Sequence, residues 1–153
     1  MRWISRRRLL QLVDEDLVRR AIAQAELRTS GEIRVSVSTF FWGSVERTAR
    51  QAFERLGMTA TRERNGVLLF VVPSRRRFAV LGDVGIHQKV GDELWRKVSA
   101  EVSGHFREGD FTGGLVRAIE LVGEELGRHF PRGPEDVNEL SDELDFGKHP
   151  PEP

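Results

Sequence analysis

A chain of 153 residues is long enough to fold as one domain with its own core. Its 24 Lys and Arg residues balance its 24 Asp and Glu residues, so no overall charge excess points to nucleic acid as a partner. The absence of cysteine excludes disulfides, thiolate metal sites and cysteine nucleophiles. The longest strongly apolar run, 67–72, is far shorter than the roughly 20 residues of a membrane span, and the N-terminus lacks a secretory-signal pattern. We therefore expect a cytoplasmic protein.

The first half of the chain predicts two helices with a strand between them. Residues 12–27 repeat apolar side chains at three- and four-residue spacing, with acidic residues 14–16 near the predicted helix start. Ile33, Val35 and Val37 alternate with polar residues, which is typical of a strand with one buried face. A second helix is predicted over 44–56, where Gly57 ends it.

The second half predicts two strands, two helices and a tail. Residues 67–72 are continuously apolar, as expected of a central strand covered on both faces. A turn at 73–76 leads into an antiparallel strand over 77–81, and two strongly periodic helices follow at about 94–106 and 111–126. After Pro131 the periodicity disappears, which indicates a tail that docks at Val137 and Leu140.

These elements predict an α/β fold, specifically a three-layer α/β/α sandwich around a small mixed sheet. The helix between the first two strands favours a right-handed parallel crossover, and the third strand then returns antiparallel to the second. We expect a basic N-terminal extension at 1–11, the folded domain at 12–130 and an acidic, proline-containing tail at 131–153.

Polar residues gather at one predicted edge of this sheet. Glu32 begins the first strand, Asn65 precedes the second and Asp83 follows the third, with His87 and Asp92 just beyond. Oxygen ligands of this kind suit Ca²⁺ or Mg²⁺, and His87 adds Zn²⁺ or Mn²⁺ as alternatives. Each residue also has a purely structural interpretation: a strand-edge charge, a turn, an acceptor for loop amides or a helix cap.

The opposite edge carries Thr39, Trp42 and the hairpin turn 74–77, which contains three consecutive arginines. Arginines bind phosphate through forked hydrogen bonds, but such a run is more often a solvated turn. No Ser-His-Asp arrangement follows from the spacing, and His105, His129 and His149 are not assigned as bases.

The N-terminal residues 1–12 combine four arginines with Trp3, Ile4, Leu9 and Leu10. This composition fits a segment that lies on an anionic membrane surface. It equally fits an extension of the first helix that packs Trp3 on the domain.

Several segments in fixed order resemble the TPM domain family, whose founders include a thylakoid-lumen phosphatase-like protein. They are Glu26–Ile33 (ELRTSGEI), Phe53–Met58 (FERLGM), Arg64–Leu69 (RNGVLL) and Gly82–Ile86 (GDVGI). The resemblance covers about 12–130 and is closest to a short, soluble bacterial branch.

The resemblance implies an α/β/α sandwich, acid-phosphatase activity proposed for plant members and divalent metal bound by several bacterial members. It also implies a membrane protein of the LemA type as a partner. In the longer branch, the loop after the third strand reads roughly Gly-Tyr-Gly-Leu-Glu-Gly, followed by an Asp. Aligned on Gly85 and Ile86, this chain places His87 at that Glu and Asp92 at that Asp.

Two functions follow as expectations. The first is a divalent-metal-binding accessory or interaction domain that works with a membrane protein. The second is a metal-assisted phosphatase acting on phosphomonoesters, with the cation held by Asp83, His87 and Asp92. A phosphatase also needs positive donors that face the phosphate, so an Arg64 side chain directed into the Asp83–Asp92 region favours the enzyme.

Overall fold

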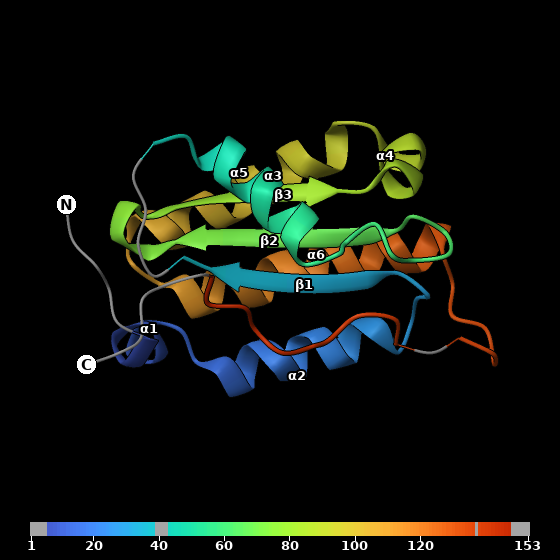
Figure 1. Ribbon diagram of the computed structural model, residues 1–153, viewed down its shortest axis with the longest axis horizontal. Helices are drawn as coiled ribbons and strands as arrows, with labels where there is room; N and C mark the ends of the chain where they lie inside the picture. The colour runs from blue at the N-terminus through green and yellow to red at the C-terminus, as the bar shows by residue number, and fades with distance from the viewer. Residues whose placement is uncertain (1–5, 39–42, 137, 148–153) are drawn as a thin grey trace.

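A three-stranded sheet, covered by helices on both faces, forms the centre of the molecule (Figure 1). The computed structural model describes residues 6–38, 43–136 and 138–147. In chain order the elements are α1 (Arg6–Leu12), α2 (Glu15–Glu26), β1 (Glu32–Val37), α3 (Val45–Arg55), β2 (Gly66–Val72), the 3-10 helix η1 (Pro73–Arg75), β3 (Arg77–Gly82), α4 (Val84–Val90), α5 (Glu93–Arg107) and α6 (Phe111–His129).

The sheet confirms the predicted topology. Its strand order is β1-β2-β3, with β1 parallel to β2 and β3 antiparallel to β2. All seven residues of β2 are buried, as its unbroken apolar sequence predicts. β1 borders only β2 within the sheet, so its other edge is available to segments from outside the sheet.

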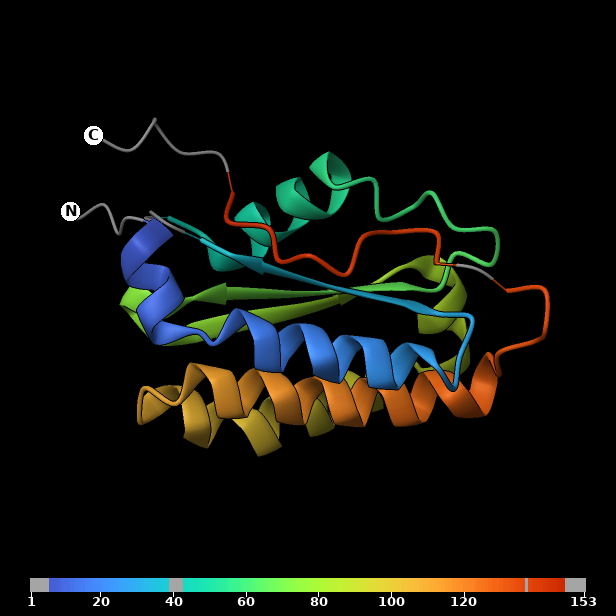
Figure 2. The same ribbon diagram turned by 90° about the horizontal axis from the view of Figure 1, so that it is seen from below.

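Each face of the sheet has its own core. Alternate residues of β1 and β2 pack with α2, α5 and α6 on one face, and the other residues of β2 pack with α3 on the opposite face. Figure 2 shows α2 and α6 side by side beneath the sheet and α3 above it. The molecule is thus the three-layer sandwich that the sequence predicts.

The predicted helix over 12–27 is wrong at its start. α1 ends at Leu12, and Asp14 caps a separate helix by accepting the Leu17 amide over 3.1 Å. An N-cap residue has non-helical backbone angles, so Asp14 interrupts the helix that its charge is expected to support. Leu17, one of the apolar residues in the helical spacing of 12–27, is 47% exposed. The short helix α4 is absent from the sequence-based prediction.

The tail returns to the domain and completes its core. We call residues 138–147 the strap; it runs beside β1 in Figure 1, coloured red. Leu144 and Phe146 are buried in the core on the α2 side, and Leu140 packs against the core on the α3 side. Docking through Leu140 is therefore confirmed, whereas Val137 lies outside the described residues.

Among the described residues, no helix combines the length and apolar character needed to cross a bilayer. Trp3 and Ile4, on which the membrane-surface interpretation rests, lie outside those residues, as do Thr39 and Trp42.

Candidate functional site

The strand register brings three of the expected site residues to one end of the sheet. Glu32 pairs with Gly66 in the parallel ladder, and its amide donates to the Asn65 carbonyl over 3.4 Å. The Asp83 amide donates to the Gly66 carbonyl over 2.9 Å. Glu32, Asn65 and Asp83 therefore lie at a common edge, as the strand directions predict.

Structural donors hold the carboxylate of Asp83. Its Oδ1 accepts from Arg64 Nη2 over 2.9 Å and from the Val84 amide over 2.8 Å, and its Oδ2 accepts from Arg64 Nε. Gly85 allows the start of α4 to approach the preceding loop, because a Cβ there would lie 2.1 Å from the Glu63 carbonyl oxygen. The Arg64 fork and the helix amide thus already engage both carboxylate oxygens.

His87 and Asp92 lie beyond Asp83 on the surface. Their side chains are 52% and 74% exposed, and His87 Nε2 is 3.9 Å from Asp92 Oδ1. Trp95 Nε1 donates to His87 Nδ1 over 3.3 Å. Asp92 also lines a shallow depression of about 430 Å³ with Trp95, Arg96 and Ser99. This location is open to solvent.

Asn65 is buried directly before the first residue of β2. Its Nδ2 donates to Ser30 Oγ and to Glu63 Oε2, both over 3.3 Å, and its amide donates to Thr61 Oγ1 over 3.1 Å. Its Oδ1 is buried and has no hydrogen-bond partner among the described residues. Asn65 therefore has one acceptor still available.

A second group of carboxyls lies deeper, where α2 ends, β1 begins and the strap passes. Glu26 and Glu32 are only 3% and 1% exposed. Glu26 Oε2 accepts the Ile33 amide over 3.0 Å, and Glu32 Oε1 accepts the Glu139 amide of the strap. The side chain of Asp142, also in the strap, contacts Glu26. We call Glu26, Glu32 and Asp142 the carboxyl cluster.

Each member of the carboxyl cluster has an oxygen without a donor. Within the described part of the chain, Glu26 Oε1, Glu32 Oε2 and Asp142 Oδ1 are all buried without a hydrogen-bond partner. A buried acceptor without a partner is destabilising by roughly 1–3 kcal/mol. These three oxygens therefore fit either shared protons or a bound cation.

Burial changes the protonation of this cluster. Burial, together with the contacts with Asp142 and Glu32, raises the pKa of Glu26 from 4.5 to about 10 against the lowering effect of the Ile33 amide. Burial also raises the pKa of Glu32, although the Glu139 amide and Glu26 act in the opposite direction. The raised pKa favours the protonated form of Glu26 at neutral pH.

The described residues contain no group of three or more His, Asp or Glu side chains already arranged around a common metal position. The carboxyl cluster is therefore not preformed around a metal position. A cation there would replace protons and separate the carboxyl groups.

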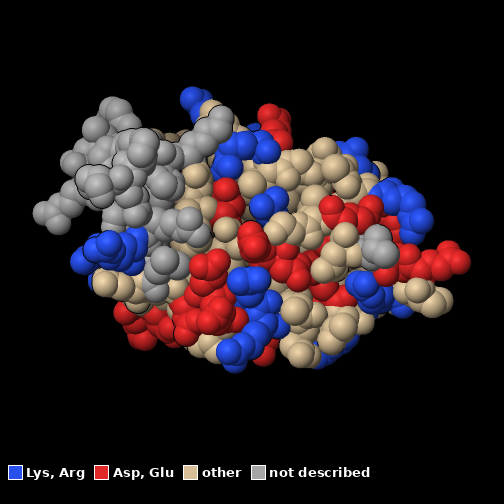
Figure 3. Space-filling model, turned by 60° about the horizontal axis from the view of Figure 1, so that its bottom comes forward, with Lys and Arg blue, Asp and Glu red and all other residues tan. Residues whose placement is uncertain are grey.

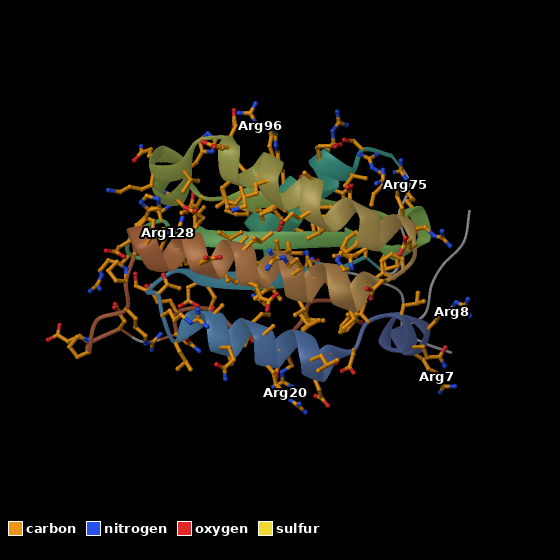
Figure 4. The ribbon with its side chains drawn as sticks, turned by 180° about the vertical axis from the view of Figure 1, so that it is seen from behind. Arg7, Arg8, Arg20, Arg75, Arg96 and Arg128 are labelled. Atoms are coloured by element: carbon orange, nitrogen blue, oxygen red, sulfur yellow. The ribbon has the colours of Figure 1, made fainter. Side chains whose placement is uncertain are left out.

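The hairpin arginines bind the protein itself. Arg75 Nη1 donates to the Gly43 carbonyl over 2.7 Å, Arg76 Nη1 donates to the Arg107 carbonyl over 2.8 Å, and Arg77 forms an ion pair with Glu46. The arginines labelled in Figure 4 point outward from several different elements. Over most of the face in Figure 3, acidic and basic side chains are interleaved.

Comparison with protein families matches residues 5–125 to the TPM domain. The chain belongs to the TPM domain family. A comparison with curated proteins found no match.

Solved structures support the same fold for this TPM domain. The BA42 protein of the psychrophilic bacterium Bizionia argentinensis is 35% identical, with a TM-score of 0.82 over 88% of this chain and 92% of that chain. The N-terminal domain of a protein from P. gingivalis is 20% identical, with a TM-score of 0.59 over 85% and 96%. The N-terminal domain of a protein from Corynebacterium glutamicum is 14% identical, with a TM-score of 0.54 over 90% and 80%. The latter two show the fold alone.

Sequence reasoning identified Glu32 of the carboxyl cluster but missed its other members. Glu26 had a detectable signal, because it continues the buried helical positions Val18, Ile22 and Ala25 of α2. An acidic residue in such a row has to be neutralised or paired. Asp142 had no comparable signal, because only the fold of this TPM domain brings the strap to α2.

Proposed function

We propose that this TPM domain is a divalent-cation-binding accessory domain whose ligands are carboxyl oxygens of Glu26, Glu32 and Asp142. The observation that carries the proposal is the set of three buried carboxyl oxygens without a donor among the described residues. An all-oxygen set favours Ca²⁺ or Mg²⁺ over Zn²⁺, which prefers nitrogen and sulfur ligands.

Protons compete with the cation in this proposal. The raised pKa values of Glu26 and Glu32 mean that both groups hold protons more tightly than ordinary carboxyls. Cation binding requires the ionised form, so it releases protons and strengthens as the pH rises. The cation would neutralise the cluster and join α2, β1 and the strap, which is a structural role.

The loop expected from the sequence is the competing location. Asp83, His87 and Asp92 supply two carboxylates and an imidazole there, which keeps Zn²⁺ and Mn²⁺ as candidates. Asp83 is engaged by Arg64, however, and Asp92 and His87 are exposed. In the buried cluster, by contrast, three carboxyl oxygens have no donor among the described residues.

A metal-assisted phosphatase is the second candidate, favoured by one observation. Arg64 does point at Asp83, so a positive donor lies beside the loop. In such an enzyme the cation would polarise a phosphoryl oxygen, and Arg64 would have to leave Asp83 to bind the phosphate. Both carboxylate oxygens of Asp83 already bind Arg64, which is therefore not available to a phosphate. For this reason we rank the accessory function first. A LemA-type membrane protein is the partner we propose for it.

The test is an NMR titration of ¹⁵N-labelled, metal-free protein with Ca²⁺, Mg²⁺, Mn²⁺ and Zn²⁺ at two pH values, about 6 and 8.5. We expect saturable shifts at Ile33 and Glu139, whose amides bind the cluster, and tighter binding at the higher pH. Glu26→Gln should weaken binding at least about tenfold, whereas Asp92→Ala should leave it unchanged.

The opposite pattern would move the site to the surface loop. If shifts are confined to 83–92 and only Asp92→Ala weakens binding, the buried cluster is not the site. If neither location responds at millimolar metal, the cation-binding function is wrong. Turnover of p-nitrophenyl phosphate with the bound metal, lost in Arg64→Gln, would establish the enzyme instead.

A further inference from the structure

The outer edge of β1 takes its hydrogen-bond partners from outside the sheet. Asp145 of the strap donates its amide to the Val35 carbonyl over 2.9 Å, and its carbonyl accepts the Val37 amide over 2.7 Å. Within the described part of the chain, these bonds form a single parallel bridge between Ser36 and Asp145 rather than a full strand pairing. An edge strand with available backbone groups is a natural docking place for an extended segment.

Side chains beside this edge recognise the acidic residue that docks there. Arg55 of α3 donates from Nη1 and Nη2 to the two oxygens of Asp145, over 3.1 and 2.7 Å. Ser36 Oγ donates to the same carboxylate over 2.8 Å. Burial raises the pKa of Asp145, but the hydrogen bonds from Arg55 and Ser36 outweigh it and lower that pKa overall. The edge thus carries a specific carboxylate receptor.

Two apolar positions flank the carboxylate. Leu144 and Phe146 are 7% and 6% exposed and join the core on the α2 side of the sheet. Since successive side chains of an extended segment point to opposite faces, they turn inward while Asp145 turns toward Arg55. The receptor therefore recognises a Leu-Asp-Phe pattern through backbone, charge and apolar contacts together.

The residues before this motif are rich in acidic side chains. Between Gly133 and Leu144 the described residues include five acidic side chains and no basic one: Glu135, Asp136, Glu139, Asp142 and Glu143. Two of them, Glu139 and Asp142, lie against the buried carboxyls Glu26 and Glu32. Arg62 also binds this stretch, because its amide donates to Glu139 Oε2 over 3.1 Å and its side chain lies 3.5 Å from Asp136. The two-fold contact with a guanidinium, however, is made by Asp145.

We propose that the outer edge of β1, with Arg55 and Ser36, is a docking site for an extended protein segment that carries an aspartate between two large apolar residues. Residues 144–146 occupy this site in cis, and a partner segment of the same chemistry takes their place when the strap detaches. Figures 1 and 2 show the strap running along the outer edge of β1. The docking contacts at 144–146 need no metal, but detachment of the strap also removes Asp142 from the proposed cation site.

The test uses the full chain in EDTA and a fluorescent peptide with the natural sequence of residues 138–147. In the protein, Asp145→Asn removes the charged contact with Arg55 and so weakens the strap in cis. We expect this variant to bind the peptide at least about tenfold more tightly than the unchanged protein. A peptide with Asn in place of its Asp should bind the variant at least about tenfold more weakly.

Two further variants keep the proposal falsifiable. Leu144→Ser loosens the strap without touching the carboxylate receptor, so it should also bind the natural peptide. Arg55→Gln combined with Asp145→Asn should lose that binding, and amide shifts at Val35 and Val37 should locate the peptide on β1. Equal affinity for the two peptides, or no gain over the unchanged protein in either strap variant, would overturn the proposal.

Discussion

Replacing Glu26 with glutamine should stabilise the metal-free protein at neutral pH. Glu26 has an ordinary pKa of 4.5 in the unfolded chain and a pKa of about 10 in the fold. Below pH 4.5 the group is protonated in both states; between 4.5 and 10 only the folded state holds the proton. The free energy of unfolding therefore falls by about 1.4 kcal/mol per pH unit across this range. Above pH 10 the stabilisation by the Glu26 proton is fully lost.

The size of the effect at pH 7 follows from that slope. Proton uptake over the 2.5 units above the ordinary pKa of 4.5 opposes folding by about 3 kcal/mol. Glutamine has the shape of the protonated acid; its oxygen can accept the Ile33 amide and its nitrogen can donate to Asp142. It needs no proton, so Glu26→Gln should gain about 3 kcal/mol at pH 7. For a domain of this size, Tm should rise by roughly 6–12 °C.

Urea denaturation and calorimetry in EDTA at pH 5, 7 and 8.5 measure this difference. The gain should be small at pH 5 and grow with pH, because the glutamine variant lacks the titrating group. Glu54→Gln, on the exposed side of α3, is the matched control and should change neither stability nor its slope. Equal pH slopes for Glu26→Gln and the unchanged protein would refute the reasoning.

Three other changes test separate parts of the structure. Asp145→Asn removes the charged hydrogen bonds of Arg55 and should lower the free energy of unfolding by about 1.5–3 kcal/mol in urea titrations. Because the fold lowers the pKa of Asp145 from 3.8, its contribution is present above that value and is lost as the pH falls through the lower folded pKa. Gly85→Ala places a Cβ against the Glu63 carbonyl and should destabilise by about 1–3 kcal/mol, with amide shifts in α4. Phe106→Ala removes a ring that is 1% exposed and should lower stability by about 3–5 kcal/mol in calorimetry.

The sequence predicted elements whose burial is repeated along the chain. β2 is apolar at every position, β1 alternates, and α5 and α6 carry long helical rows, so each pattern points to one structure. α4 is a short helix of seven residues with one buried position, Ile86, which is too little to produce a pattern. The break before α2 was missed because Asp14 has the same sequence signature as a charge inside the first turn.

The candidate site was less predictable because it depends on contacts between distant segments. Strand directions correctly placed Glu32, Asn65 and Asp83 at one edge. They could not show that Arg64 forms an ion pair with Asp83, since that contact depends on side-chain geometry. The proximity of Asp142 to Glu26 depends on the path of the strap, which no local pattern specifies.

The pairing of β1 with the strap has a consequence for synthesis. Ser36 and Asp145 are 109 residues apart, so the edge of β1 cannot be covered until that length has been made. At about 5–20 residues per second, the ribosome needs roughly 5–20 s to do so. During this interval a nascent chain exposes an unpaired strand edge, and neighbouring chains on the same messenger are most exposed to mispairing. Translation speed through 38–145 should therefore influence the yield of correctly folded protein.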